Sequence, residues 1–312
     1  MNALLDLQDK LRTNTSAIGR LEMALMDHAD SPVIQANLRS LRKLQSSLNE
    51  EFRMVASEIG VDVCSYRLLE DRPTARALAK VLAGFQDAFS TVYESLASGK
   101  PITTRRQLRP GTVEVTDLRV AYTFPGSFGI VLTVTRDQLL FEDWKTKADE
   151  AIGIVFDVAR SRSAGEVSRI ARQLGRAPVA ALYSWAKANV QNKTGADVQW
   201  NTAVTKHPNA ILVQYPEFED LSHSIEETGE ERLETLQFRG SLVGADTKTR
   251  RFHFVTTDDQ DIRGKFKDVI NESQQARLPS RYVATVEVRT KVNFATGDED
   301  ITYDLLKLAE LS

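Results

Sequence analysis

The sequence predicts an α+β protein with N-terminal antiparallel helices in a coiled-coil-like heptad pattern, a central α/β domain with antiparallel strands and a helical hairpin, and a small C-terminal β-barrel. Apolar residues recur at steps of three and four over roughly the first hundred residues, which is typical of packed helices. Short segments that alternate apolar and polar residues end the chain and predict strands. We expect four parts: helices over 1–99, a central domain over 112–215, an acidic linker or helix over 216–235, and the barrel over 236–312.

The first two heptad runs, residues 4–25 and 34–59, fit an antiparallel helical hairpin. Residues at one level of such a hairpin have numbers with a constant sum, and this rule places Asn14 opposite Gln45. An unpaired amide in an apolar seam costs about 1–3 kcal/mol, so we expect the two amides to form a buried polar layer that sets the register. In the alternative, both amides face solvent on a loose helix pair.

A third heptad run, residues 78–96, either closes a bundle with the hairpin or extends it into a rod. An apolar stripe that stays uncovered can bind another chain. We therefore expect a protein partner, a homo-oligomer or both to dock on the N-terminal helices. Packing within the chain is the alternative.

A basic loop rich in glycine and proline follows the helices. Arg105, Arg106 and Arg109 lie in it without a neighbouring acid, which makes them candidate contacts for phosphate or an acidic partner. A solvated linker is the alternative. Residues 112–134 then alternate apolar and polar side chains around Pro-Gly-Ser, which predicts two strands joined by a turn.

Helices are predicted over 141–159 and, in two pieces around Gly175, over 163–190; the following ADVQWNTAV segment predicts a strand beneath them. The pair around Gly175 has the spacing of a helix-turn-helix. In that interpretation Arg169, Arg172 and Arg176 contact a nucleic-acid backbone. A packed helical hairpin is the alternative, because the second helix carries mostly alanine and large apolar side chains that read base edges poorly.

The stretch 216–235 is rich in carboxylates. Paired carboxylates can serve acid–base or Mg²⁺ chemistry, but a run of them is typical of a solvated helix or linker.

Five strands are predicted in the C-terminal part, with a short helix or long connection over 267–279. Acidic and basic residues balance there, which weakens a nucleic-acid interpretation. A one-sided basic patch at the first turn remains a candidate site for an anionic or protein partner, formed by Lys248, Arg250, Arg251 and His253.

The order of PGSFGIVLTV, a helical stretch, ADVQWN, RGSLVGADTKTRRFHFVTTDDQDIRGKF and YVATVEVRT resembles a widespread family of uncharacterised bacterial proteins. The resemblance covers about residues 112–312. It implies a C-terminal small SH3-like or OB-like barrel, with Gly240 and Gly264 at tight backbone positions and Phe252 and Phe266 in the core. It also implies an association with mobile-element or phage-conflict loci, and it carries no established reaction.

Composition restricts the classes of function. The formal charge of −3 disfavours a surface covered with phosphate-binding residues. Cys64 is the single cysteine, and no HExxH, CxxC, Walker or GxGxxG motif occurs, so we expect no metal and no cofactor. No apolar run reaches the roughly 20 residues that span a bilayer, so we expect a cytoplasmic protein without a membrane partner.

The sequence therefore favours a non-enzymatic bacterial scaffold or adaptor for protein–protein interaction. The alternative is a nucleic-acid-binding accessory protein that uses the basic residues of the central helices and the barrel. An enzyme with a spatially assembled site is the third hypothesis, and the sequence favours it least.

Overall fold

The computed structural model describes residues 2–70, 73–104, 107–124, 128–135, 146–202, 208–266, 280–295 and 298–310. The fold class is α+β, as predicted. The chain forms two compact units, Met1–Ile225 and Glu226–Ser312, which differs from the four expected parts. The reason is that the hairpin and the third helical run both pack on the central sheet, and the acidic stretch is divided between a helix and a strand.

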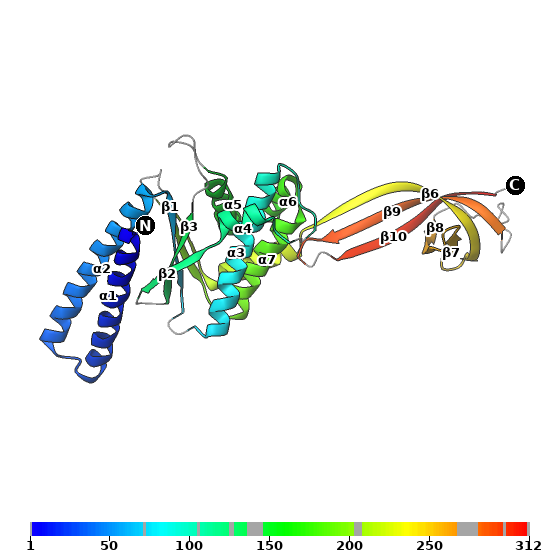
Figure 1. Ribbon diagram of the computed structural model, residues 1–312. Helices are drawn as coiled ribbons and strands as arrows, with labels where there is room; N and C mark the ends of the chain where they lie inside the picture. Colours follow the sequence, from blue (N-terminus) through cyan, green and yellow to red (C-terminus); the bar gives the residue numbers. More distant parts are fainter. Residues whose placement is uncertain are drawn as a thin grey trace. The chain divides into compact units, whose positions relative to one another are not determined.

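The N-terminal unit combines a helical hairpin, a five-stranded sheet and a layer of helices (Figure 1). Its elements in chain order are α1 (Asn2–Asp27), α2 (Pro32–Glu58), β1 (Val61–Leu68), α3 (Ala75–Ser98), α4 (Pro110–Thr116), β2 (Arg119–Phe124), β3 (Gly129–Thr135), α5 (Lys147–Ser161), α6 (Ala164–Leu174), α7 (Arg176–Gln191), β4 (Ala196–Asn201), β5 (Asn209–Val213) and α8 (Tyr215–Glu226). The strand order is β2-β3-β1-β4-β5, and all neighbours run antiparallel.

The hairpin of α1 and α2 has the register that the pairing rule predicts. Asn14 Nδ2 donates to Gln45 Oε1 at 2.6 Å and to the carbonyl of Leu41 at 3.0 Å. Both amide side chains are buried. A second bond runs from Gln45 Nε2 to the hydroxyl of Thr15 at 3.3 Å. The seam therefore carries one satisfied polar layer between apolar levels.

β1 lies at the centre of the sheet and separates the hairpin from the third heptad helix. On one face, Val63 shares a core with Leu11 and Phe52 of the hairpin. On the other face, Tyr66 packs on Phe85 of α3, with ring centroids 5.1 Å apart, and accepts a 3.0 Å hydrogen bond from the indole N–H of Trp185 in α7. The expected three-helix bundle or rod is thus wrong, because α3 packs on α7 across the sheet from the hairpin.

Residues 112–116 form helix α4 and not the predicted start of a strand. Pro110 occupies the first turn, where its missing N–H costs nothing. Thr112 donates to the buried carboxylate of Glu94 in α3, and the hydroxyl of Thr116 lies 2.8 Å from that of Ser90. These contacts with α3 override the alternating pattern. The Pro-Gly-Ser turn and residues 141–145 of the predicted helix lie outside the described residues.

The C-terminal unit contains a closed barrel with strand order β10-β8-β7-β6-β9. Its strands are β6 (Gly229–Asp246), β7 (Arg251–Thr256), β8 (Asp261–Phe266), β9 (Ser280–Asn293) and β10 (Glu299–Glu310). Residues 229–235, expected in a linker, are the first part of β6. The expected helix or connection over 267–279 lies outside the described residues.

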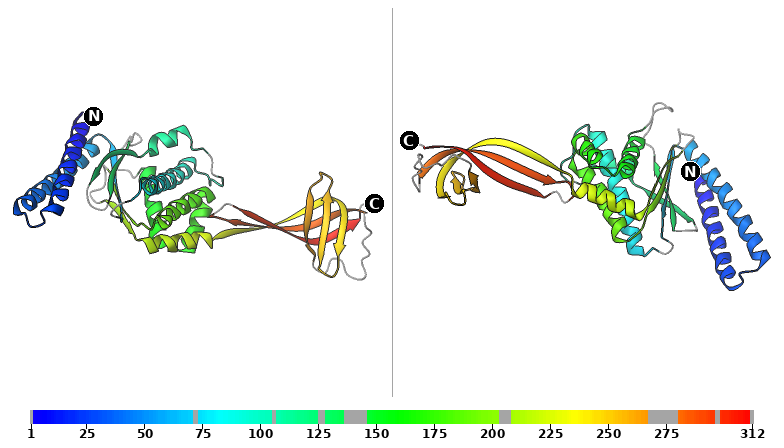
Figure 2. Two further views of the ribbon diagram at one scale, coloured as in Figure 1. Left: turned by 90° about the horizontal axis from the view of Figure 1, so that it is seen from below. Right: turned by 180° about the vertical axis from the view of Figure 1, so that it is seen from behind.

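Three of these strands extend beyond the barrel (Figure 2). Residues 229–238 of β6 and 299–303 of β10 both pair with β9, which lies between them. We call this three-stranded ribbon the arm. The barrel proper has an apolar interior built from alternate residues of each strand, including Phe252, Phe254 and Ile262.

Candidate functional site

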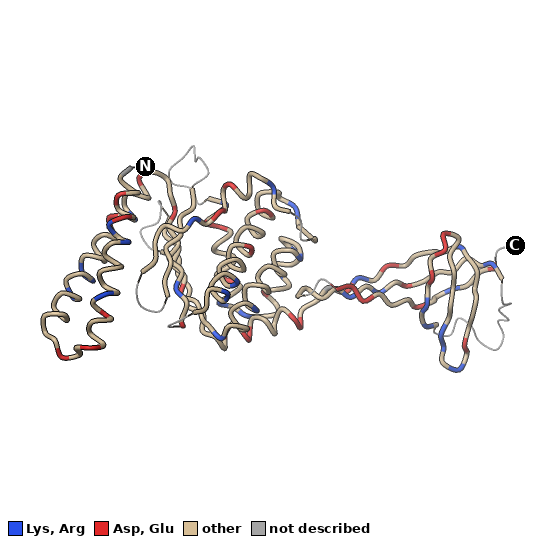
Figure 3. Tube along the Cα trace, turned by 60° about the horizontal axis from the view of Figure 1, so that its bottom comes forward, with Lys and Arg blue, Asp and Glu red and all other residues tan. Residues whose placement is uncertain are grey.

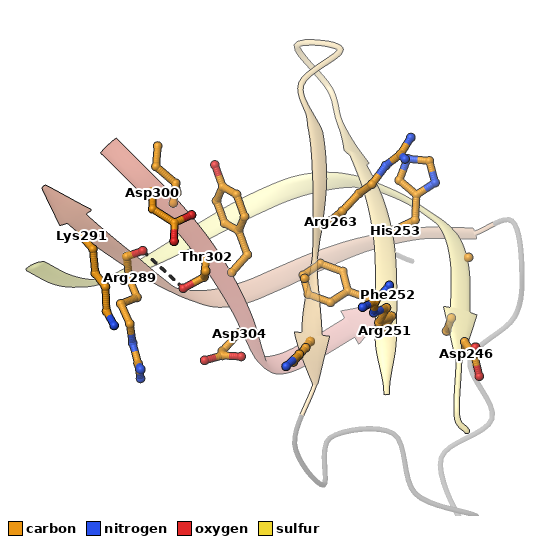
Figure 4. A pocket seen from close by; sticks show the side chains of 16 residues that line it. Asp246, Arg251, Phe252, His253, Arg263, Arg289, Lys291, Asp300, Thr302 and Asp304 are labelled. Atoms are coloured by element: carbon orange, nitrogen blue, oxygen red, sulfur yellow. Dashed lines mark hydrogen bonds between the residues drawn. The ribbon is translucent and has the colours of Figure 1, made fainter. Parts of the chain in front are cut away.

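A groove of about 970 Å³ lies where the arm meets the β7–β8 hairpin. β8 pairs with β10 through Lys265 with Asp304 and Phe266 with Leu305. Beyond these pairs the two strands diverge, and the groove opens between them. Figure 4 shows Arg289 and Lys291 on the arm side of this groove and His253 and Arg263 on the hairpin side.

Strand alternation places the cations of the hairpin on its outer face. Phe252 and Phe254 of β7 point into the barrel, so Arg251 and His253 point outward. The same alternation applies to β8 and exposes Arg263 and Lys265. The basic side chains of both strands therefore lie on the outer face of the hairpin and line the groove. Figure 3 marks the lysine and arginine positions along the Cα trace.

The register sets these cations directly against one another. Arg251 is opposite Lys265, and His253 is opposite Arg263. Like charges in facing positions of an antiparallel pair are destabilising. The chain carries this cost at the level of Arg251 and Lys265, and the next level places Arg263 opposite a histidine. The hairpin surface is therefore a candidate site for an anionic ligand.

Asp261 partly compensates the second of these levels. Its carboxylate accepts a 2.9 Å hydrogen bond from Arg263 and forms a second hydrogen bond with Nε2 of His253. Burial acts to raise the pKa of Asp261, but the bonds from Arg263 and His253 outweigh it and lower the pKa overall. At the first level, neither Arg251 nor Lys265 forms a side-chain hydrogen bond or ion pair with a described residue, but the register places Arg251 opposite Asp246 and Lys265 opposite Asp304. The charge of Arg251 helps to lower the pKa of Asp246.

The arm side of the groove carries the other two cations. Arg289 Nε lies 3.1 Å from Glu231 in an ion pair without hydrogen-bond geometry. Thr302 donates to the carbonyl of Arg289 at 3.4 Å, which ties β10 to β9. Lys291 has no side-chain partner among the described residues. Lys265 and Lys291 thus form no side-chain hydrogen bond or ion pair with a described residue, although the register places them opposite Asp304 and Asp300.

Two strand edges border the groove. Residues 299–303 of β10 pair with β9 on one side, and residues 261–264 of β8 pair with β7 on one side. Within the described part of the chain, no strand occupies the space between these edges. The groove therefore combines open backbone groups with cationic side chains.

The turn between β6 and β7 places the remaining predicted cations beside the groove. Asp246 accepts the backbone N–H groups of Lys248 (2.8 Å) and Thr249 (3.1 Å) and the Thr249 hydroxyl (2.6 Å). These bonds, led by that from the hydroxyl, lower the pKa of Asp246. Arg250 has a positive φ of 55°, and its backbone carbonyl accepts a 3.0 Å hydrogen bond from the N–H of Phe266. Lys248 and Arg250 are exposed next to Arg251.

The helix pair around Gly175 is the packed helical hairpin of the predicted fold class, and not a helix-turn-helix. Gly175, with a φ of 94°, joins α6 and α7. Just after it, the backbone N–H of Ala177 donates a 2.9 Å hydrogen bond to the carbonyl of Ile102, in the segment before α4. The face of α7 that would read bases is buried around Trp185. Helix-turn-helix recognition requires an exposed second helix, so that hypothesis fails here.

The other predicted basic residues belong to the N-terminal unit, not to the groove. Arg169 is paired with Glu166 on the surface of α6, and Arg109 with Glu94. Arg172 is exposed, and Arg176 is partly buried at the start of α7. Arg105 and Arg106 lie outside the described residues.

Sequence reasoning found Arg251 and His253 but missed Arg263, Lys265, Arg289 and Lys291. The missed residues come from two strands, β8 and β9, and only the strand register brings them together with Arg251 and His253. Their alternation with apolar residues was the available signal, since it places each one on the outer face of its strand.

No protein-family model, curated protein or solved structure matches the chain. The structure contains the small closed barrel that the sequence resemblance implies, and no matching model supports the family itself. Among the described residues, no cluster of three or more His, Cys, Asp or Glu side chains is placed to hold a metal ion. None of the described helices has the length and apolar character to cross a membrane.

Proposed function

We propose that the chain is a non-enzymatic scaffold or adaptor that binds other proteins, and that one docking surface is the open edge of β6 in the arm. The supporting observation is the pairing of residues 229–238. They pair with β9 on one side, and no described strand pairs with their other side. Such an edge offers a row of backbone donors and acceptors to an incoming strand.

The side chains of this edge favour a specific partner strand. Leu233 is 57% exposed and Leu236 is 40% exposed, and their odd and even positions put them on opposite faces of the ribbon. A partner strand would cover part of both. Glu231 and Arg232 are exposed just before these two leucines, and Glu234 is exposed between them. Charges on an edge suppress indiscriminate pairing, so the edge selects a strand with a complementary charge pattern.

The end of the helical hairpin offers a second docking surface. Met23, Met26 and Val33 are 61%, 75% and 65% exposed close to the α1–α2 turn. Large apolar side chains gathered at a surface are typical of an interaction site. A chain that docks one protein at each unit would act as an adaptor. Self-association through the N-terminal helices, expected from the heptads, would be one form of this binding.

Binding of nucleic acid is the alternative function. The facing cations Arg251 and Lys265 on the β7–β8 hairpin favour it, while the buried α7 and the paired Arg169 count against it. Titration of labelled single- and double-stranded DNA and RNA across a salt series tests it, because phosphate contacts make affinity fall steeply with salt. The association with mobile-element or phage-conflict loci rests on the sequence resemblance alone, and the genes that neighbour this one test it.

Site-specific photo-crosslinking in cells of the source organism tests the adaptor proposal. A photoreactive residue replaces Leu233 or Leu236, and Val243 is the matched control because it is 47% exposed on the same strand, at the register shift between β6 and β7 and outside the arm. We expect both arm positions to capture the same protein, identified by mass spectrometry, and the control position not to capture it.

A binding assay then tests whether the captured protein depends on the edge. We expect purified L233K to lose affinity for the captured protein and V243K to retain it. Capture at all three positions alike, or equal binding of the two variants, would contradict the proposal.

A further inference from the structure

We propose that the groove between β10 and the β7–β8 hairpin binds an extended acidic polypeptide, which adds as a strand to the open edge of β10. This inference rests on the proposed function, because it names the chemistry of one protein partner. It uses a different surface from the edge of β6.

The backbone supplies the first part of the argument. Residues 299–303 of β10 are paired on one side by β9, and β8 has turned away from them beyond the Asp304–Lys265 pair. The close approach still includes Gly264, where a Cβ atom would lie 2.0 Å from the carbonyl oxygen of Tyr303, and the two strands part beyond this point. The two strands therefore approach closely at one end and leave a slot at the other. Strand addition is the recognition mode that such an edge supports.

Charge supplies the second part. Five basic side chains line the groove: Arg251, Arg263, Lys265, Arg289 and Lys291. Three aspartates also line it: Asp246, Asp300 and Asp304. The carboxylate of Asp246 already accepts three hydrogen bonds within the β6–β7 turn. Lys265 and Lys291, one from each side, form no side-chain hydrogen bond or ion pair with a described residue, although each lies opposite an aspartate of β10 in the register. An acidic strand between them would face a cation on either side.

The same lining disfavours a nucleic-acid strand. Binding of single strands uses exposed aromatic platforms as well as positive charge. Here Phe252 and Phe266 are buried in the barrel, and Tyr303 is only partly exposed. Asp300 and Asp304 lie along the β10 edge, where a continuous phosphate backbone would meet them. Carboxylates at alternate positions of a peptide can avoid these two aspartates.

The test measures binding of the purified full-length chain to a fluorescent peptide that alternates glutamate and threonine. Three competitor ligands are compared with it: the peptide with glutamine for glutamate, the peptide with N-methyl groups along one edge, and single-stranded oligothymidylate. We expect the glutamate peptide to bind and both altered peptides to bind at least about tenfold more weakly, since each lacks one of the two interactions.

Charge-reversal variants locate the site. The K265E/K291E double variant should bind the glutamate peptide about tenfold more weakly, because each change replaces attraction by repulsion. K307E is the matched control, since Lys307 is an exposed cation of β10 outside the groove lining. Neither Lys265 nor Lys291 forms a side-chain contact that folding would lose.

Three results would overturn the inference: equal binding of the glutamine peptide, equal binding of the N-methylated peptide, or oligothymidylate binding that exceeds peptide binding and disappears in K265E/K291E. The last result would make the groove a nucleic-acid site. Loss of peptide binding without loss of crosslinks at the β6 edge would reject this inference alone and leave the adaptor proposal standing.

Discussion

Arg251 and Lys265 face each other directly across β7 and β8, on the outer surface of the barrel. The register also places Arg251 opposite Asp246 and Lys265 opposite Asp304, so these carboxylates offset part of the repulsion between the two cations in the free protein. A ligand with negative charge would relieve that repulsion when it binds. The same two residues therefore link the stability of the barrel to its proposed partner.

Neutralising one member of the pair should stabilise the free barrel. We expect K265Q to slow amide exchange in β7 and β8 by an amount that corresponds to about 0.2–1 kcal/mol, because it removes a facing like charge. Hydrogen–deuterium exchange reports these strands separately from the N-terminal unit. K307Q, which lies opposite Thr285, is the control and should leave exchange unchanged. Faster exchange in K265Q would show that the pair is not repulsive.

The polar layer of the hairpin should behave as a coupled pair. Asn14→Ala leaves the buried amide of Gln45 without its partner, and we expect it to lower the free energy of unfolding by about 1–3 kcal/mol. The double replacement of Asn14 and Gln45 by leucine should cost less than the sum of the single changes. Urea denaturation followed by circular dichroism measures this cycle. Additive effects would mean that the two amides act independently.

Closure of the barrel should depend on Gly264. A Cβ atom there would lie 2.0 Å from the Tyr303 carbonyl oxygen and 2.8 Å from the Phe252 ring, so G264A must displace β8 or β10. We expect a loss of about 1–3 kcal/mol. G244A is the control, because its nearest neighbour is the His253 Cβ at 3.8 Å. The two variants are compared by exchange protection of β8, and equal protection would contradict the close approach.

Acid should weaken the β6–β7 turn. The folded-state pKa of Asp246 is lowered, so its contribution to stability is present above its unfolded pKa and is lost as the pH falls through the folded value. We therefore expect D246A to be less stable than the unaltered chain near neutral pH, and the difference to shrink below about pH 4. Thermal melts over a pH series measure it, with D258A as the control. A difference that stays constant with pH would show that the carboxylate charge is not involved.

The sequence predicted best those features that neighbouring residues determine. The heptad spacing and the pairing rule placed Asn14 against Gln45, because a hairpin brings residues together in a fixed order. The alternation of apolar and polar residues predicted the five barrel strands, because it is also a local pattern. The central position of β1 depends on pairing with β3 and β4, which come far later in the chain, and no local pattern indicates that pairing.

The candidate site shows the same limit. Arg251 and His253 stood out because they follow one basic turn, whereas Arg289 and Lys291 come from a strand some forty residues later in the chain. Their meeting depends on the register of β9 with β10 and on the point where β8 leaves β10. Helix α4 is a further case, since contacts of Thr112 and Thr116 with α3 outweigh an alternating sequence.

Hydrogen–deuterium exchange of the arm on addition of the glutamate peptide tests the central claim most directly, because it reports whether a protein segment pairs with the open edge of β10. We expect slower exchange at residues 299–303 with the glutamate peptide, and no change with the glutamine peptide or in K265E/K291E. Unchanged exchange at these residues while the peptide is bound would contradict strand addition and place its binding elsewhere on the chain.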